Sequence, residues 1–196
     1  LLLHGNRLTK TTQFQLQDSG IRHDVGDPVQ QAKVYEAQLA DEIILLDIRA
    51  TVENRGTAHL LEWTKRVAEE VTIPLTVGGG IGSVEEAIEL IRNGAEKVVL
   101  GAAAYGNGLI RGIAAELGNQ SIVAALDVRK WQVTTRSATW THPTDVVSTA
   151  RALEASGVCE ILLTSVDKEG AMLGYDLDLV HEVSHSVGIP VVANGG

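Results

Sequence analysis

The chain has 196 residues, of which 44% are hydrophobic, so it can form one domain with a sizeable core. Its formal net charge of −9 at pH 7 argues against nucleic acid or an acidic membrane surface as a partner. No apolar run reaches the roughly 18 residues of a membrane helix, and Leu1-Leu-Leu3 lacks the basic flank of a signal peptide.

Helical and strand signals alternate along the chain. Asp27-Pro28 starts a helix with an N-cap and a proline at the first helical position, and Ser83-Val-Glu-Glu86 is a capping box. The strands are almost wholly apolar, as parallel strands buried on both faces are. This alternation predicts a β/α barrel. Helices are expected over 28–39, 57–71, 83–93, 108–117, 143–156 and 177–187, and strands over 42–48, 74–77, 96–100, 121–127, 159–165 and 190–193.

Two segments interrupt this alternation. The β-like pattern between Arg129 and Thr141 predicts a small hairpin after the fifth strand, and Asn6 to Lys10 predicts a similar one after the first. Including a first strand that contains Leu1, we count seven strands and no eighth. We therefore expect one α/β domain over residues 1–196, a (βα)8 TIM barrel present as a fragment that lacks the start of strand one and the eighth strand unit.

A repeated segment indicates how such a barrel arose and what it binds. Ile73-Pro-Leu-Thr-Val-Gly-Gly-Gly80 recurs as Ile189-Pro-Val-Val-Ala-Asn-Gly-Gly196, and each copy follows an earlier apolar strand. This repetition is typical of a duplicated half-barrel of the ribulose-phosphate-binding type. Glycines at strand ends let backbone N–H groups approach an anion, so two such corners suggest a substrate with a phosphate at each end. The other interpretation is that these glycines only turn the chain.

Cysteine and histidine usage restricts the chemistry further. Cys159 is the one cysteine, which excludes an internal disulfide framework and fits a reducing, cytoplasmic location. The six histidines lie scattered without ligand spacing, so we expect no metal site and no cofactor.

Several motifs, taken in order, resemble the cyclase subunit of imidazole glycerol phosphate synthase over essentially the whole chain. That family implies a barrel that forms a heterodimer with a glutaminase, from which ammonia passes through the barrel. The ammonia attacks a bis-phosphorylated ribulosyl aminoimidazole carboxamide, and cyclisation gives imidazole glycerol phosphate in histidine biosynthesis. The motifs are Gly26-Asp-Pro-Val29, Asp41 to Ile48, Thr76 to Ile81, Gly94 to Val98, Ala125 to Arg129, Glu160 to Ser165 and Gly174-Tyr-Asp176.

The resemblance places a catalytic aspartate at Asp127, where strand five ends on the barrel face that carries chemistry. We expect it to transfer protons; the other interpretation is that it caps the following loop. Asp47 either orients the substrate or pairs with Lys10 or Arg49. We expect one phosphate at Gly80, Gly101 and Ala102, and the other at Thr164, Glu169, Gly170 and Gly195, through backbone N–H groups. The predicted substrate-binding set is Lys10, Asp47, Gly80, Gly101, Ala102, Thr164, Glu169, Gly170 and Gly195.

Charged residues stand at the starts of three strands, on the opposite face of the barrel. In the family, the positions of Glu42, Lys97 and Glu160 form a ring through which ammonia enters, and Thr76 would be a polar step inside it. The other interpretation is a solvated rim.

Some positions depart from the family pattern. Leu2 stands where the family has its other catalytic aspartate, so a mechanism with two carboxylates cannot run unchanged. His4 shares the strand parity of Leu2 and is either a substitute or a solvated turn residue. Gly101-Ala102 replaces the usual Asn-Thr, and Glu169 replaces an aspartate.

These departures keep other functions open. One is a paralogue that uses ammonia to amidate a surface-polysaccharide sugar, and another is a catalytically silent barrel that activates a glutaminase. A third is aminoimidazole ribotide isomerase, which shares the duplicated barrel and needs no ammonia. The charged ring favours an ammonia user over the isomerase.

Overall fold

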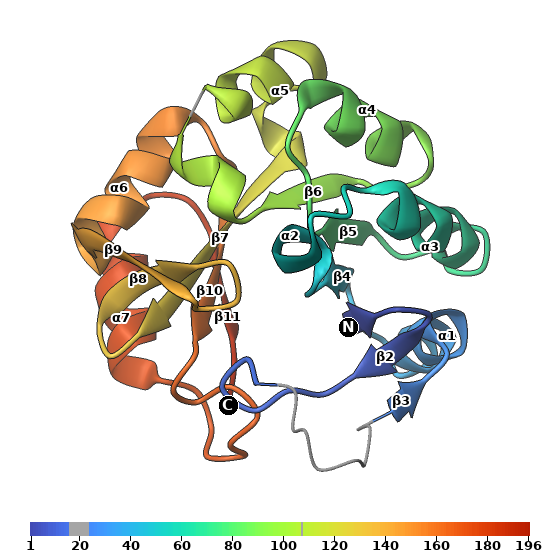
Figure 1. Cartoon of the computed structure of the whole chain (residues 1–196), viewed down its shortest axis with the longest axis horizontal. Coiled ribbons are helices and arrows are strands. Elements are labelled where there is room, and N and C mark those ends of the chain that lie inside the picture. Colours follow the sequence, from blue (N-terminus) through green and yellow to red (C-terminus); the bar gives the residue numbers. More distant parts are fainter. Residues whose placement is uncertain (16–23, 107) are drawn as a thin grey trace.

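The computed structural model describes residues 1–15, 24–106 and 108–196. Within them, seven parallel strands curl around a central space in the order β11-β10-β7-β6-β5-β4-β1 (Figure 1). The predicted α/β architecture with seven parallel strands is therefore confirmed. No described strand pairs between β1 and β11, which end the row. The parallel strands are β1 (Leu2–His4), β4 (Ile43–Asp47), β5 (Leu75–Gly78), β6 (Lys97–Leu100), β7 (Ile122–Arg129), β10 (Glu160–Ser165) and β11 (Val191–Asn194).

The longer helices surround the curled sheet on its outer side (Figure 1). The α-helices follow the predicted ranges, except for the later start of the helix expected from Pro143 and for the short α2, which the sequence pattern did not indicate. No helix in the described ranges has the length and hydropathy needed to cross a membrane. The α-helices are α1 (Pro28–Ala37), α2 (Ala50–Glu53), α3 (Ala58–Ala68), α4 (Val84–Arg92), α5 (Leu109–Leu117), α6 (Val146–Ser156) and α7 (Leu177–Ser186), and the 3₁₀ helices are η1 (Ala102–Tyr105) and η2 (Asn119–Ser121).

Both predicted hairpins are present. Strand β2 (Arg7–Thr9) pairs with β1 and with β3 (Asp24–Gly26), and β8 (Gln132–Thr135) joins β7 to β9 (Trp140–Asp145). The helix expected from Pro143 begins instead at Val146, because Pro143 lies in β9. That strand pairs with β8 alone, and proline is tolerated on such an edge. The Asp145 carboxylate then caps α6 by accepting a hydrogen bond from the Ser148 N–H.

The alternation of side chains along the parallel strands divides the interior into layers. Val99, Val123 and Leu162 form an apolar cluster inside the barrel, separate from the core under the helices. Side chains two positions along a strand point the same way. The inward layer on the C-terminal side of this cluster therefore contains Asp127, Thr164 and Asn194, and the layer on its N-terminal side contains Glu42, Lys97 and Glu160.

The predicted capping box at the start of α4 is also observed. The Ser83 hydroxyl accepts a hydrogen bond from the Glu86 N–H at 3.2 Å, and the Glu86 carboxylate accepts one from the Ser83 N–H at 3.2 Å. We expect Ser83→Ala to lower the free energy of unfolding by about 1 kcal/mol, because one N-terminal N–H of the helix loses its acceptor. Urea unfolding measures this change. Ser184→Ala is the control, since the exposed Ser184 hydroxyl donates to the His181 carbonyl within α7 and not to a helix cap; equal effects of the two variants would contradict the prediction.

Candidate active site

A cavity of about 1700 Å³ runs from the barrel interior to the loops that follow the parallel strands. The predicted catalytic residue and every predicted substrate-binding residue line it, although they come from loops far apart in sequence. Leu2 also lines the cavity, whereas His4 is absent from its lining. Position 4 therefore gains no support as a substitute for the missing carboxylate. The ten predicted residues on its wall are Lys10, Asp47, Gly80, Gly101, Ala102, Asp127, Thr164, Glu169, Gly170 and Gly195.

Asp127 lies on the inward face of β7, one layer above the apolar cluster. Burial raises the pKa of its carboxyl group to about 7, and a hydrogen bond from the Thr164 hydroxyl offsets part of that rise. A group that titrates near neutral pH can both give and take a proton. The Asp127 backbone carbonyl accepts a hydrogen bond from the Thr134 hydroxyl in the hairpin, so the loop contact is made by the backbone.

The Asp127 carboxyl group also affects the pKa of Tyr105 in η1. Burial and the negative charge of Asp127 both raise the pKa of the Tyr105 hydroxyl, which therefore stays protonated. That hydroxyl donates a hydrogen bond to the Ala125 carbonyl at 2.9 Å. Tyr105 thus fixes η1 against β7 two residues before Asp127.

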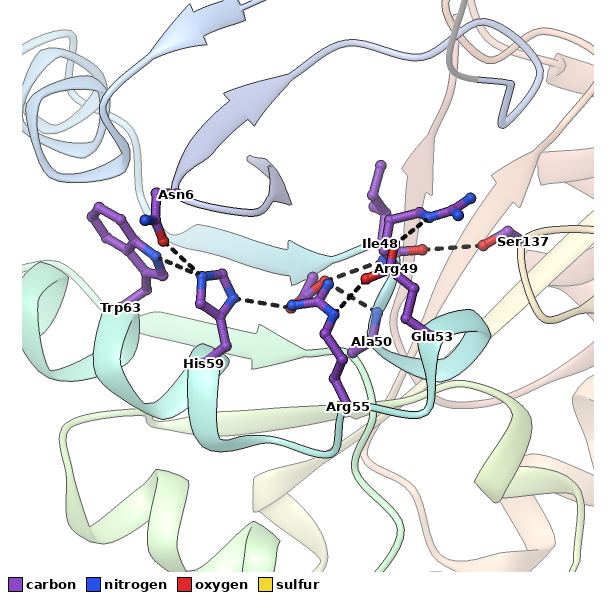
Figure 2. Close-up of polar contacts among 10 residues, drawn as sticks. Asn6, Ile48, Arg49, Ala50, Glu53, Arg55, His59, Trp63 and Ser137 are labelled. Carbon is purple, nitrogen blue, oxygen red and sulfur yellow. Dashed lines mark hydrogen bonds and ion pairs between the residues drawn. The ribbon is translucent and has the colours of Figure 1, made fainter.

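Asp47 is buried at the end of β4, and both of its carboxylate oxygens are engaged. Oδ1 accepts from the N–H groups of Arg49 and Ala50 at 3.1 Å and from Arg55 Nη2 at 3.0 Å, while Oδ2 lies 3.3 Å from His59 Nδ1 (Figure 2). Among these contacts of the described residues, none joins the Asp47 side chain to the side chain of Lys10 or Arg49, so that alternative of the two is wrong. Asp47 holds together the loop between β4 and α3.

The guanidinium groups of this loop have other partners. Arg49 Nε donates to Glu53 Oε1 at 3.1 Å, one helical turn further on (Figure 2). Arg55 Nε lies 2.6 Å from Glu53 Oε2 as an ion pair, although the angle does not suit a hydrogen bond. The Glu53 carboxylate therefore offsets positive charge from both arginines. A direct contact of Asp47 with substrate stays a prediction.

His59 connects this loop to the first hairpin. The Trp63 indole N–H lies 3.2 Å from His59 Nε2, and His59 Nδ1 lies 3.3 Å from Asp47 Oδ2 (Figure 2). Asn6 of the β1–β2 turn approaches the same Nε2 at 3.1 Å. Nothing in the local sequence pattern connected Asn6 to His59, because the two are 53 positions apart along the chain.

The first glycine corner packs directly against the end of β4. A Cβ atom on Gly79 would lie 2.3 Å from the Asp47 carbonyl oxygen, and one on Gly80 would lie 2.8 Å from the Gly56 carbonyl oxygen. Both residues have positive φ, so glycine is required there to turn the chain. Within the described residues, the N–H groups of Gly80 and Gly101 meet no acceptor, which leaves them available to a ligand.

The second corner is held by the first loop of the barrel. The Glu169 carboxylate accepts hydrogen bonds from the Thr11 hydroxyl at 2.6 Å and from the Phe14 N–H at 2.9 Å. The Glu169 N–H donates to the Ser165 carbonyl at 2.9 Å, so it is not available to a phosphate, contrary to expectation. A Cβ on Gly170 would lie 2.1 Å from the Thr11 carbonyl oxygen. This corner therefore depends on the close approach of the first loop.

The charged layer at the other end of the barrel is a connected cluster. Lys97 Nζ lies 3.1 Å from Glu42 Oε2 and 3.3 Å from Glu160 Oε2. The three side chains are only 13–27% exposed, which is low for a solvated rim. Thr76 is fully buried, and its hydroxyl donates to the Glu42 carboxylate. The four residues that the sequence analysis grouped therefore lie together in the structure. Their role in ammonia passage stays a prediction.

Known proteins are similar in sequence to this chain over most of its length. The model of the family described as "Histidine biosynthesis protein" matches residues 7–196. Imidazole glycerol phosphate synthase subunit HisF of Sulfurisphaera tokodaii is 47% identical over 178 residues, which cover 88% of this chain and 71% of the relative. The subunits of Myxococcus xanthus and Chlorobium limicola are 43% and 44% identical, each over 98% of this chain and 75% and 76% of the relative. The chain therefore belongs to the histidine biosynthesis protein family.

Proposed function

We propose that this chain is the cyclase subunit of an imidazole glycerol phosphate synthase. It uses ammonia to convert a bis-phosphorylated ribulosyl aminoimidazole carboxamide to imidazole glycerol phosphate, with water and a phosphorylated aminoimidazole carboxamide as the by-products, a step of histidine biosynthesis. One observation carries the proposal. Asp127 and both glycine corners line one cavity in the barrel, and the cluster of Glu42, Lys97 and Glu160 lies at the opposite end of the same strands. The identity of 43–47% with the HisF subunits supports the same reaction.

The chemistry assigns a definite task to Asp127. Ammonia adds to the carbonyl carbon of the substrate, and the resulting hydroxyl group must leave as water. A protonated carboxyl group can supply the proton for that departure and then take one back from the nitrogen. Because burial raises the pKa of Asp127 to about 7, a large fraction of the group carries this proton at neutral pH. Leu2 cannot share the task, so Asp127 performs both transfers.

The phosphates of the substrate bind at the two corners. The Gly80 and Gly101 N–H groups serve one phosphate, and the loop at Gly170 and Gly195 serves the other. Lys10, which follows β2 and lines the same cavity, adds a positive charge near the doubly anionic ligand. The distance between the corners then selects substrates that carry both phosphates.

A glutaminase supplies the ammonia from the opposite end. It docks where Glu42, Lys97 and Glu160 meet, and ammonia passes this cluster to reach the cavity. Thr76, with its hydroxyl on the Glu42 carboxylate, is a polar contact at the entrance. The cluster is partly buried within the chain itself, which suits a gate better than a solvated rim.

A two-part assay of the full-length protein tests this function. With an ammonium salt, we expect the subunit alone to form imidazole glycerol phosphate, detected by mass spectrometry. With glutamine, we expect product only when the glutaminase is also present. Conversion of the isomerase substrate without any nitrogen donor, or no product under either condition, would refute the proposal.

Leu2 favours a second candidate substrate. An apolar residue on β1, in place of a carboxylate, suits an amidation that needs one proton-transfer group, such as that of a surface-polysaccharide sugar. Complementation of a histidine auxotroph by the full-length gene separates the two. Growth supports the cyclase, whereas soluble expression without growth counts against it.

A further inference from the structure

Three polar side chains lie side by side on adjacent strands in the inward layer that contains Asp127. Thr164 of β10 is in register with Asp127 of β7 on one side and with Asn194 of β11 on the other. All three line the cavity. Thr164 is only 2% exposed, so its hydroxyl finds its hydrogen-bond partners among these neighbours.

The hydrogen bonds in this row have a direction. Asn194 Nδ2 donates to Thr164 Oγ1 at 3.2 Å. A hydroxyl has one hydrogen, and since its oxygen already accepts from Asn194, that hydrogen is free for the Asp127 carboxyl, to which Thr164 is hydrogen-bonded. The amide of Asn194 thus determines where the only hydrogen of Thr164 points.

We propose that Asn194 is a positioning residue for Asp127, acting through the Thr164 hydroxyl. It keeps that hydroxyl donating to one oxygen of the Asp127 carboxyl group and leaves the other oxygen to the substrate. Its role rests on the proposed function, in which Asp127 moves protons. Asn194 itself makes no bond in the reaction.

Other ionisable groups surround Asp127 and must stay constant in a test. The negative charge of Asp127 raises the pKa of the Tyr105 hydroxyl. The charged side chains that line the same cavity are Lys10, Glu42, Asp47, Arg49, Glu86, Arg136 and Glu169. Substitutions at Asn194 and Thr164 change none of them, so their influence on Asp127 is common to all proteins compared.

The test compares Asn194→Ala, Asn194→Asp and Thr164→Val in the full-length protein, assayed with an ammonium salt. We expect Asn194→Ala to lower kcat about tenfold with little change in KM, since the Thr164 hydroxyl is no longer held toward Asp127 and its hydrogen bond to that carboxylate is weakened. The midpoint of the pH profile should move upward, because the Thr164 hydroxyl, which favours the ionised form of Asp127, is no longer held in the donating orientation. Asn194→Asp should move it further, because a carboxylate would accept the Thr164 hydrogen and add a like charge.

A double variant shows whether Asn194 acts through Thr164. Thr164→Val removes the hydroxyl while keeping the side-chain shape, so adding Asn194→Ala to it should change kcat and the midpoint no further. Asn119→Ala on η2, an exposed residue outside the cavity, is the control for a general loss of function. Independent effects of the two substitutions, or an Asn194→Asp variant with the wild-type midpoint, would overturn the proposal.

A direct titration keeps this result separate from the proposed function. Carbon NMR of labelled aspartate follows the Asp127 carboxyl without substrate, so the midpoint in wild type and in Asn194→Ala can be compared even if no product forms. An upward shift supports the positioning role whatever the reaction is. An unchanged midpoint refutes it, while absence of product from an otherwise titrating wild-type protein refutes only the cyclase assignment.

Discussion

Asp127→Asn is expected to lower kcat with an ammonium salt by about 10²- to 10⁴-fold, the usual contribution of a general acid–base group. Asparagine keeps the size of aspartate but carries no proton that it can give to the leaving hydroxyl. The substrate corners are untouched, so KM should change little. Steady-state kinetics of the full-length protein measures both quantities. A variant that retains more than half of the wild-type kcat would remove Asp127 from the mechanism.

The pH dependence gives this prediction a direction. Burial raises the pKa of Asp127 from 3.8 to about 7, so the proton-donating form declines as pH rises through about 7. At constant free ammonia, kcat of the wild type should therefore fall across that range. The residual activity of Asp127→Asn should lack this decline; an identical pH profile in both proteins would contradict the assignment of Asp127 as the donor.

The raised pKa of Asp127 also predicts how the free energy of unfolding changes with pH. A carboxyl group whose folded pKa is raised contributes stability that is fully present below its unfolded value, here 3.8, and is lost as pH rises through about 7. The wild type should therefore lose free energy of unfolding across this window, and Asp127→Asn should not. Urea unfolding at several pH values measures the difference. It also separates lost chemistry from lost folding, because the variant is expected to be at least as stable as the wild type above pH 7.

The layered barrel could be derived from the sequence because its signals are local. The caps at Asp27 and Ser83 and the apolar runs of the strands depend on neighbours only, and both caps are confirmed. Pro143 misled the sequence argument because proline also suits an edge strand, and pairing at that edge is not visible in local propensity.

The details of the site depend on contacts between distant segments. Asp47 meets His59 and Arg55 because α3 returns over the end of β4, and no pattern around residue 47 encodes that return. Asn194 was missed although a signal existed. It follows Val192 by two positions on a strand whose partners were already placed, so the same alternation that directs Asp127 inward directs Asn194 inward as well.

Lys97→Met should affect both stability and the use of glutamine. Lys97 lies between Glu42 and Glu160, and removing it leaves two partly buried carboxylates without their cation. Burial by itself would lower the pKa of Lys97, but hydrogen bonds and charge attraction from both glutamates raise it overall. The stabilisation is therefore present below the unfolded pKa of 10.5 and is lost as pH rises above the folded value. We expect a loss of about 1–3 kcal/mol at neutral pH, less than for a fully buried pair.

Lys33→Met is the matched control for that loss. Lys33 also pairs with a glutamate, Glu70, at 2.7 Å, but both side chains are 48% exposed. Exposed pairs contribute little to stability because solvent screens them, so urea unfolding should separate the two methionine variants. Equal losses would mean that the Lys97 cluster gains nothing from its burial.

The functional effect of Lys97→Met should depend on the nitrogen source. If ammonia from the glutaminase passes this cluster, loss of the cation disturbs the entrance and the docking surface, while the cavity and Asp127 remain intact. We expect glutamine-dependent turnover to fall about tenfold or more relative to turnover with an ammonium salt, which corresponds to about 1.4 kcal/mol. Assays of the reconstituted complex with both nitrogen sources measure this ratio. An equal fall with both sources would point to general unfolding, and no fall with either would place the ammonia path elsewhere. Only a selective fall connects the charged layer to the passage of ammonia, because the two assays differ in how nitrogen enters the barrel.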